Sequence, residues 1–548
     1  MKRRGWLWVL GGCLAAIVVL GAVLVLFGPS LYRAFYLSKV GDSGGVLRPA
    51  QAAYDVRRYD LDIYIAPATR TITGHNLITV AVNAPLDVFE VQLDDLLQIS
   101  AASVDGVAAQ FTHADGLISV RLPVAWQAGE RHAVRITYGG QPVEALNPPW
   151  IDGFVWEQTP SGAPWIGVTT EGSGGDLWWP CKDHPSDEPD EGMTITVTVP
   201  DDLVALSNGR KTGEQHNADG TLTTHWTVHY PINNYNVTLN IAPYVPVEAP
   251  YHGIDGTLNE TIIFWAIPEH AEPAKKLWAE QGAKILTVLG KRFGEYPFLK
   301  DKYWVAETPY LGMEHQTIIA YGNNFKNNAY GFDNLLLHET AHEWWGNKIT
   351  ARDWADFWIH EGFGSYAEAV YVNDTLGKEK YFEYMRRTCS HVGNRTPIVQ
   401  GENITASRAY IGDIYTKGSC VLHALRWLVG DEAFFQALYR FQTDPQYAYG
   451  LVDTQDFIDL VAQISGQDID WFWQRYIYQA AAPRLYMERS NGVVTLRWDD
   501  PGFAMPLPVK FGGILHRINF DDGTARISVP AGAELEIDPQ GWVLMERE

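Results

Sequence analysis

A short stretch of the sequence carries residues whose types and spacing could hold a metal ion. Leu335–Asn347 reads LLLHETAHEWWGN and contains His338 and His342, with Glu339 directly after the first histidine. Side chains four residues apart lie on one face of a helix, so both imidazoles can reach a single Zn²⁺ at about 2.0–2.1 Å. The Glu339 carboxylate can then act as general base on water at that ion. The pattern predicts a hydrolytic zinc site.

A catalytic zinc takes three protein ligands, and a downstream carboxylate suits the third position. Glu361 lies in DFWIHEGFGSYAEA (Asp356–Ala369), with 18 residues between it and His342. Its neighbours are apolar and aromatic, so a carboxylate buried there would be costly without a partner. A metal would satisfy it. We expect one Zn²⁺ per chain, held by His338, His342 and Glu361.

These two stretches resemble the signature of the zinc aminopeptidases of peptidase family M1, the gluzincin family that includes aminopeptidase N. The resemblance implies that His338, His342 and Glu361 are the zinc ligands and that Glu339 is the catalytic base. It covers about residues 51–548 and is specific at four motifs.

A third motif, YLGMEHQ at Tyr310–Gln316, is similar to the family's GxMEN motif. It implies that Glu314 binds the free α-amine of a substrate and that the backbone of Gly312 and Met313 lines the peptide. A carboxylate suits an ammonium ligand. The sequence departs from the family at His315, where the family has Asn. We expect His315 to lie near the α-amine and to make binding sensitive to pH.

Two further matches extend the resemblance. Tyr415 lies in IYTKG, which resembles the family's YxKG motif, and this implies that its hydroxyl donates to the oxyanion that develops during hydrolysis. Glu171 precedes a WWPCKDHP segment that is similar to one in the family's β domain. At this position the family carries a Gln or Glu that also contacts the α-amine.

The elements that must position these residues follow from the hydrophobic pattern. Up to about residue 250 the period is two, as in Leu61, Ile63 and Ile65, which is typical of half-buried antiparallel strands. From about 255 to 480 the period is helical. The predicted helices span residues 271–294, 333–347, 361–373, 415–428, 431–442 and 454–465.

Strands return near the C-terminus, where Asp522-Gly523 predicts a hairpin turn between residues 518–520 and 525–527. We therefore expect an α+β multidomain protein: a linker at 29–50, an N-terminal antiparallel β saddle at 51–250, a thermolysin-like, mainly α zinc catalytic domain at 251–480, and a small β-sandwich at 481–548. Saddle, thermolysin-like domain and sandwich are what the resemblance implies. The large C-terminal helical domain of many family members has no counterpart before Glu548, so we expect a more open site or closure by a partner subunit in an oligomer.

An apolar segment near the N-terminus predicts a membrane anchor. Trp6–Gly28 contains 23 residues without a charge, enough to span a bilayer as a helix. Lys2, Arg3 and Arg4 precede it, which favours a cytoplasmic N-terminus and an extracytoplasmic catalytic domain. We interpret residues 1–28 as a single-pass signal-anchor, in a bacterial cell membrane. A cleaved signal peptide is the alternative.

Composition excludes other classes of protein. With 42 Lys and Arg against 65 Asp and Glu, the net charge is −23, which argues against a nucleic-acid partner. The four cysteines include no CxxC pair. Cys389 and Cys420 could form a disulfide outside the cytosol or remain buried thiols.

Together these features predict a membrane-anchored zinc aminopeptidase that acts on peptides with a free N-terminus. The alternative is a thermolysin-type endopeptidase, which would cleave blocked peptides. A non-enzymatic receptor that retains a peptidase fold predicts loss of a ligand or of the base, and all of these residues are present.

Overall fold

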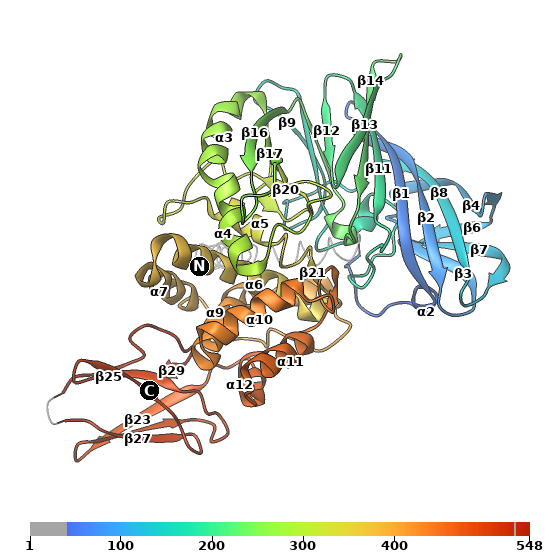
Figure 1. Ribbon diagram of the computed structural model, residues 1–548. Helices are drawn as coiled ribbons and strands as arrows, with labels where there is room; N and C mark the ends of the chain where they lie inside the picture. The colour runs from blue at the N-terminus through green and yellow to red at the C-terminus, as the bar shows by residue number, and fades with distance from the viewer. Residues whose placement is uncertain (1–40, 531–532, 548) are drawn as a thin grey trace, which may run out of the picture. The chain divides into compact units, whose positions relative to one another are not determined.

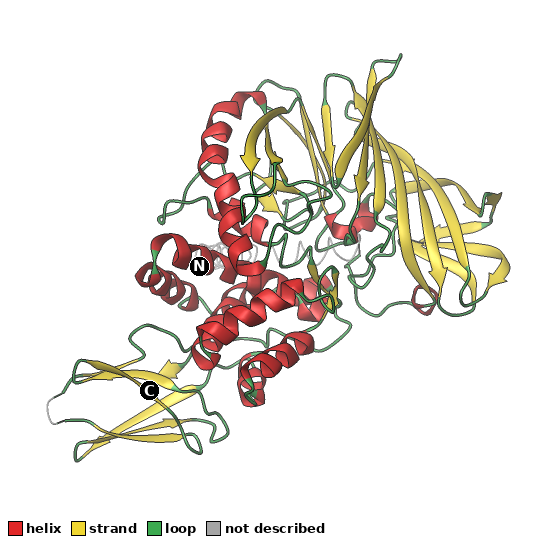
Figure 2. Cartoon of the chain, viewed as in Figure 1, coloured by secondary structure: helices red, strands yellow, loops and turns green. Residues whose placement is uncertain are grey.

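The computed structural model describes residues 41–530 and 533–547 (Figure 1). The predicted anchor at Trp6–Gly28 lies outside the described residues. Within the described ranges, no helix is both long and apolar enough to cross a membrane. From Ser43 onward the chain is one structural unit. Strands make up its N-terminal part, and helices gather in its middle (Figure 2).

The N-terminal part forms a large sheet because its long strands alternate buried and exposed side chains. In β1 (Tyr54–Ala66), Leu61, Ile63 and Ile65 are buried while Asp62 and Tyr64 are exposed, which confirms the predicted period of two. The sheet has eight strands in the order β13-β14-β11-β1-β2-β8-β4-β5. The other strands are β2 (Thr71–Val82), β4 (Leu97–Val104), β5 (Val107–Ala108), β8 (Arg131–Gly140), β11 (Met193–Pro200), β13 (Arg210–His216) and β14 (Thr221–Val228).

One pairing in this sheet departs from the predicted antiparallel arrangement. β1 runs parallel to β11, from Tyr59 opposite Met193 to Tyr64 opposite Thr198. The long intervening chain, part of which builds other sheets, allows this parallel return. Those sheets have the orders β3-β7-β6 and β12-β15-β10-β9. Their strands are β3 (Leu86–Gln92), β6 (Phe111–Ala114), β7 (Leu117–Trp126), β9 (Gly153–Gln158), β10 (Pro164–Thr169), β12 (Val204–Ser207) and β15 (Leu239–Ala242). Short helices are α2 (Pro49–Ala52), η1 (Gly175–Leu177) and η2 (Asn234–Asn236).

The middle of the chain contains a sheet that the sequence did not predict. Its five strands have the order β16-β17-β18-β20-β19, with β17, β18 and β20 parallel and the two edge strands antiparallel. A buried strand such as β20 (Ile318–Tyr321) has no exposed side chains, so no period of two marks it. β16 crosses residue 250, where we expected a domain boundary. The other strands are β16 (Val245–Tyr251), β17 (Glu260–Ala266), β18 (Trp304–Glu307) and β19 (Gly312–Met313).

Helices lie beside this sheet, and the predicted ones are present with shifted ends. The helix predicted at 271–294 is interrupted by a π-helical turn, η4 (Trp278–Gly282), where the Trp278 indole N–H donates to the Ile262 carbonyl. α7 and α12 were not predicted. The helices are η3 (Pro268–His270), α3 (Ala271–Leu277), α4 (Ala283–Phe293), α5 (Asn334–Ala341), η5 (Trp354–Asp356), α6 (Trp358–Leu376), α7 (Lys378–Cys389), α8 (Ala406–Ala409), α9 (Gly412–Val429), α10 (Asp431–Thr443), α11 (Thr454–Ser465) and α12 (Asp470–Tyr476). A two-stranded sheet pairs β21 (Ile349–Ala351) with β22 (Gly450–Val452).

The C-terminal part contains two small sheets, of orders β27-β24-β23-β29 and β26-β25-β28. A turn is present at Asp522-Gly523, as predicted: both residues have positive φ, and Asp521 bridges Thr524. The prediction that this turn joins the two strands of a hairpin is wrong. The flanking strands join different sheets, since β26 pairs with β25 and β27 with β24. The strands are β23 (Arg484–Ser490), β24 (Val493–Trp498), β25 (Leu507–Phe511), β26 (Ile514–Ile518), β27 (Thr524–Ser528), β28 (Leu535–Ile537) and β29 (Glu546–Arg547).

A disulfide bond joins Cys389 at the end of α7 to Cys420 in α9. The two cysteines are therefore paired in the structure, and are not the two buried thiols that the sequence also allowed. Cys181 is buried and free.

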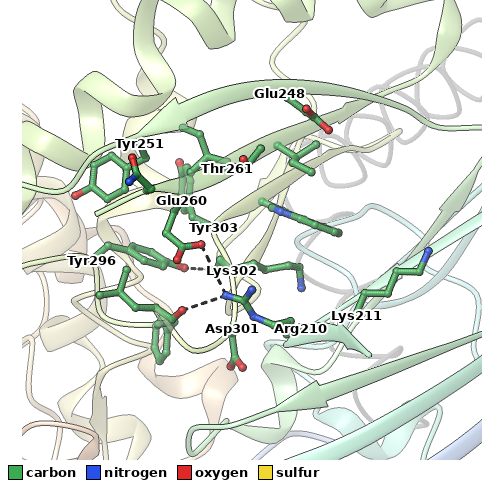
Figure 3. Close-up of a pocket in the computed structure, with 16 residues that line it drawn as sticks. Arg210, Lys211, Glu248, Tyr251, Glu260, Thr261, Tyr296, Asp301, Lys302 and Tyr303 are labelled. Atoms are coloured by element: carbon green, nitrogen blue, oxygen red, sulfur yellow. Dashed lines mark hydrogen bonds and ion pairs between the residues drawn. The ribbon is translucent and has the colours of Figure 1, made fainter. Parts of the chain in front are cut away.

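Polar contacts at the seam between the N-terminal strands and the middle domain hold the zinc-motif helix in place. A cavity of about 490 Å³ lies at this seam, with Arg210 of β13, Tyr296 and Tyr303 in its wall (Figure 3). Arg210 donates to the carbonyls of Leu299 and Lys300. Two tyrosines of the same cavity wall reach α5 and the residues that follow it: Tyr303 bonds to Thr340 at 2.6 Å, and the Tyr296 hydroxyl donates to Glu343, two residues after the helix. The seam therefore fixes α5 against the five-stranded sheet.

Candidate metal centre

Two helices bring the predicted ligands together. α5 begins at a capped end, where the Asp333 side chain accepts from the Leu336 N–H. It ends at Ala341, so His338 and His342 lie in and just after its last turn. α6 begins at Trp358, which places Glu361 in its first turn. The helix predicted at 361–373 thus starts earlier in the structure.

The three ligand atoms fit a zinc ion. The two Nε2 atoms of His338 and His342 are 3.2 Å apart, and each lies 3.4–3.5 Å from Glu361 Oε2. Ligands of a tetrahedral zinc at about 2.0–2.1 Å are separated by about 3.3 Å. Glu361 Oε2 is buried and has no hydrogen-bond partner among the described residues. An unpartnered buried oxygen at this distance from two imidazole nitrogens fits a metal ligand.

Neighbouring groups orient both histidines toward that point. His338 Nδ1 lies 2.8 Å from Glu368 Oε1, and His342 Nδ1 lies 2.9 Å from the Trp345 carbonyl. Each Nδ1–H therefore donates outward and leaves Nε2 free for a metal. Glu368 also accepts from the Tyr384 hydroxyl. Sequence reasoning missed Glu368, although it lies seven residues after Glu361 and so on the same face of α6.

Glu339 is positioned beside the ligands. It is 7 % exposed. Burial raises the pKa of Glu339 to about 8. A Cβ atom on Gly312 would lie 2.9 Å from Glu339 Oε1. The edge strand β19 therefore approaches the base closely only because residue 312 is glycine.

A pocket of carboxylates adjoins the metal centre. Glu171 and Glu314 are buried, and one carboxylate oxygen from each lies within 4.8 Å of Glu361. Burial raises the pKa of Glu171, and the charges of Glu314 and Glu361 add to that rise. The Tyr235 hydroxyl donates to Glu314 and the Tyr410 hydroxyl to Glu171. Such a pocket favours a cationic ligand.

Tyr415 lies at the edge of the same centre. Its hydroxyl donates to Glu361 Oε1 at 2.8 Å, and its oxygen lies 2.9 Å from the Tyr410 hydroxyl oxygen. Its ring stacks on His338 with centroids 6.1 Å apart. Burial raises the pKa of Tyr415, so its phenol stays a hydrogen-bond donor at neutral pH. Tyr410 and Tyr235 were not predicted, since an isolated tyrosine gives no sequence signal.

His315 does not behave as we expected. Its side chain is fully buried, and neither ring nitrogen has a hydrogen-bond partner among the described residues. Burial lowers the pKa of His315 to about 3. It is therefore neutral between pH 5 and 8, and the prediction of pH-sensitive binding through His315 is wrong. Gly312 and Met313 form β19, at the edge of the five-stranded sheet beside α5.

Comparison with known proteins gives a consistent result. Residues 280–476 match the peptidase family M1 domain. Aminopeptidase 2, mitochondrial, of Saccharomyces cerevisiae is 24 % identical over 342 residues, 58 % of this chain and 34 % of its own length. Human endoplasmic reticulum aminopeptidase 1 is 23 % identical over 471 residues, 78 % of this chain and 48 % of its own. This chain therefore spans about a third to a half of these relatives.

Among solved structures, the M1 zinc metallopeptidase from Deinococcus radiodurans aligns with a TM-score of 0.67 and 26 % identity. The alignment covers 81 % of this chain and 98 % of that protein.

Two histidines four residues apart on a helix and a carboxylate on a following helix define a zinc hydrolase centre of the gluzincin type. Together with the family match over residues 280–476, they indicate a peptidase family M1 domain in that part of the chain, in agreement with the predicted resemblance. The ligand geometry and the similarity to zinc metallopeptidases indicate a zinc cofactor.

Proposed function

We propose that this protein is a zinc aminopeptidase that removes the N-terminal residue of peptides. One observation carries the proposal: Glu171 and Glu314 lie within 4.8 Å of the ligand Glu361. An α-ammonium held by these carboxylates would bring the first peptide bond, and no other, to the metal centre.

Each residue of the centre has a role in this reaction. Zinc held by His338, His342 and Glu361 would supply Lewis acidity, which polarises the scissile carbonyl and acidifies water. Glu339 takes a proton from the attacking water and passes it to the leaving amine. Tyr415 donates its hydroxyl to the developing oxyanion.

The relatives support an exopeptidase more than an endopeptidase. The yeast and human relatives named above are called aminopeptidases. One Deinococcus radiodurans structure, 25 % identical to this chain, contains Tyr-Ser-Ala as substrate. A blocked peptide would leave the Glu171 and Glu314 carboxylates buried without a cationic partner, which is unfavourable. We therefore infer that substrates carry a free N-terminus.

The proposal includes a membrane location. It rests on the uncharged segment Trp6–Gly28 and the positive residues before it. The catalytic domain then faces the extracytoplasmic side, an oxidising location that suits the Cys389–Cys420 disulfide. Fractionation of cells and alkaline extraction of membranes test this part: release by alkaline carbonate would contradict it.

The first test of function compares two chromogenic substrates on the full chain in mild detergent. One carries a free N-terminal leucine, and the other is identical but N-acetylated. We expect cleavage of the free-amine substrate only, loss of that activity with a chelator, and recovery when Zn²⁺ is restored. Equal cleavage of both substrates would favour the endopeptidase.

The variant Glu339→Gln tests the base separately from the metal. Because the side chain keeps its size but cannot accept a proton, we expect zinc content near one per chain and a loss of kcat of about 10²–10⁴-fold. Undiminished kcat at full zinc occupancy would exclude Glu339 as the base.

A further inference from the structure

Three buried asparagines connect the end of α5 to the loop between β19 and β20, residues 314–317, which begins with Glu314. They are Asn208, Asn236 and Asn347, and none is more than 4 % exposed. Asn208 follows β12, Asn236 ends η2, and Asn347 follows α5. Because buried amides need hydrogen-bond partners, the bonds of these side chains show which segments are held together.

Asn347 links a metal ligand to Glu314. Its backbone N–H donates to the carbonyl of His342 at 2.9 Å. Its side-chain amide donates to the carbonyl of Glu314, also at 2.9 Å. One residue therefore connects the backbone of a zinc ligand to the backbone of the residue that we expect to bind the substrate amine. Both bonds are buried, which strengthens them and holds the two segments at a fixed separation.

Asn236 extends this link along the loop. Its side-chain amide donates to Asn347 Oδ1 at 3.0 Å, and its own Oδ1 accepts from the Gln316 N–H at 3.1 Å. Asn208 donates to the carbonyls of Asn236 and Gln316, both at 2.8 Å. The backbone of the loop is therefore bonded both to the end of α5 and to segments of the N-terminal part.

The neighbour of Asn236 on η2 contacts both halves of the carboxylate pocket. The Tyr235 hydroxyl donates to the Glu314 carboxylate at 3.1 Å. The Tyr235 carbonyl accepts from the Thr170 hydroxyl at 3.0 Å, and Thr170 directly precedes Glu171. Since Asn236 bonds η2 to the end of α5, the two carboxylates and the metal-binding helix share one set of hydrogen bonds.

Thr317, at the end of the loop, indicates that the loop conformation is imposed by its surroundings. Its φ is +66°, a value that a β-branched residue rarely adopts. Its N–H donates to Glu343 Oε1 at 2.8 Å, and its hydroxyl accepts from the Gly209 N–H at 2.9 Å. Glu343 directly follows the ligand His342. Bonds from both sides therefore keep Thr317 in an unfavourable conformation.

We propose that Asn236 and Asn347 are positioning residues that set the distance between Glu314 and the metal centre. A carboxylate held at one distance accepts an amine on the carbon next to the scissile carbonyl and rejects an amine one carbon farther away. The substrate class is therefore α-amino rather than β-amino peptides. This inference rests on the aminopeptidase function proposed above and names the residues that fix its register.

The test compares leucine p-nitroanilide with β-homoleucine p-nitroanilide on the full chain in mild detergent, with enough enzyme to measure slow cleavage. The extra methylene of the second substrate adds a bond of about 1.5 Å between the amine and the scissile carbonyl. We expect wild-type kcat/KM to be at least about 10²-fold higher for the α-amine, the cost of a misplacement of about 1 Å. Asn347→Ala and Asn236→Ala should each lower this ratio about tenfold, the size of one lost hydrogen bond. Zinc content should stay near one per chain, because neither side chain contacts a ligand side chain.

Asn240→Ala is the matched control. Asn240 of β15 is equally buried, but neither polar atom of its side chain has a hydrogen-bond partner in the part of the chain that the structure describes. The variant removes the same atoms without breaking a bond to the loop, so we expect the wild-type ratio. Asn347→Asp is a milder variant if an alanine variant fails to fold. It keeps the size of the side chain and accepts from Asn236, but its carboxylate cannot donate to Glu314, so the ratio should fall here too.

Three outcomes would overturn the inference: a wild-type ratio near one, an unchanged ratio in the Asn236 and Asn347 variants, or an equal fall in Asn240→Ala. The ratio does not depend on how much of the enzyme is folded. A variant that only destabilises the protein would therefore lose activity on both substrates and keep the ratio. Cleavage of leucine p-nitroanilide by the wild type with any of these outcomes would leave the aminopeptidase standing without this role for the asparagines. No cleavage of it or of any free-amine peptide would contradict the function itself.

Discussion

At the scale of single residues, the metal centre concentrates negative charge in a buried space. Glu171, Glu314, Glu339 and Glu361 are each less than 8 % exposed. In such surroundings the carboxylates need cations, which are the metal on one side and a substrate ammonium on the other. The site is therefore incomplete electrostatically until both are bound.

Tyr415 and Tyr410 have adjacent hydroxyls but different expected roles. Because Tyr415 stacks on His338 and would face the oxyanion, Tyr415→Phe should lower kcat by about 10²–10³-fold with a small change in KM. Tyr410→Phe removes the donor to Glu171 and should mainly raise KM for free-amine substrates. Steady-state kinetics separate the two. A change in KM alone for Tyr415→Phe would exclude the oxyanion role.

At the scale of elements, the disulfide between Cys389 and Cys420 ties α7 to α9. α9 carries Tyr415, and α7 carries Tyr384, whose hydroxyl donates to Glu368 behind His338. The bond therefore links the helix that supports a metal ligand to the helix that presents Tyr415.

Reducing this disulfide should destabilise the protein. The bonded cysteines are 31 residues apart, and closing a loop of that length is worth about 3–4 kcal/mol through the unfolded chain. Urea unfolding with and without reductant measures the effect. The double variant Cys389→Ala, Cys420→Ala is the control, because reductant should not change its stability. Equal stability of the oxidised and reduced wild type would contradict the prediction.

The segment that precedes the N-terminal domain also connects elements that are distant in the sequence. Ser43 donates its N–H to Gly172 O and accepts at its carbonyl from Ala406 N, which links the β domain to α8. Gly44, with φ of +83°, packs against Trp354, where a Cβ would lie 2.2 Å from Cδ1. Gly172, which accepts from Ser43, directly follows Glu171.

Two glycine variants test the packing of this segment. Gly44 and Gly41 both have positive φ, but a Cβ on Gly41 would meet nothing within 4 Å. Both alanine substitutions carry the same backbone strain, so Gly44→Ala should destabilise the protein by about 1–3 kcal/mol more than Gly41→Ala, through overpacking against Trp354. Thermal unfolding of both variants measures the difference. Matching midpoints would show that the segment is not packed as described.

At the scale of the whole molecule, the helical domain and the C-terminal sheets share one hydrophobic cluster, and the N-terminal sheets form another. His423 of α9 lies where the first cluster joins the C-terminal part. Its Nδ1 is 2.6 Å from the Tyr381 hydroxyl and its Nε2 is 3.0 Å from the Gly541 carbonyl. Neutral His423 accepts at one nitrogen and donates at the other.

This histidine predicts a loss of stability in acid. Burial lowers the pKa of His423 to about 3, against 6.5 for an exposed histidine. The unfolded chain therefore binds the proton first, and the stabilisation present above pH 6.5 is lost as pH falls toward 3, by about 1.4 kcal/mol per pH unit. The unfolding free energy of the wild type should fall between pH 7 and pH 5. In His423→Gln, which does not titrate at this position, that fall should be smaller by about 2 kcal/mol. Urea unfolding at both pH values measures this, and identical drops would contradict it.

Much of the site could be predicted from local spacing. The spacing of His338 and His342 places both on one helix face, and that spacing is a property of the chain itself. The long strands of the N-terminal sheet were equally predictable, because the alternation of apolar and polar residues, as in Leu61–Ile65, indicates which side chains are buried. The five-stranded sheet beside the helices was not, since its short buried strands have no alternation.

The sequence by itself determined the ligand types, the helix that presents two of them and the apolar segment near the N-terminus. Only the tertiary structure decided which distant groups surround that helix. Tyr410 beside Glu171, Glu368 behind His338 and the burial that keeps His315 neutral all depend on packing between separate elements. The physical reason is that spacing along a chain fixes neighbours within one element, whereas hydrogen-bond partners and desolvation across elements arise only when the chain has folded.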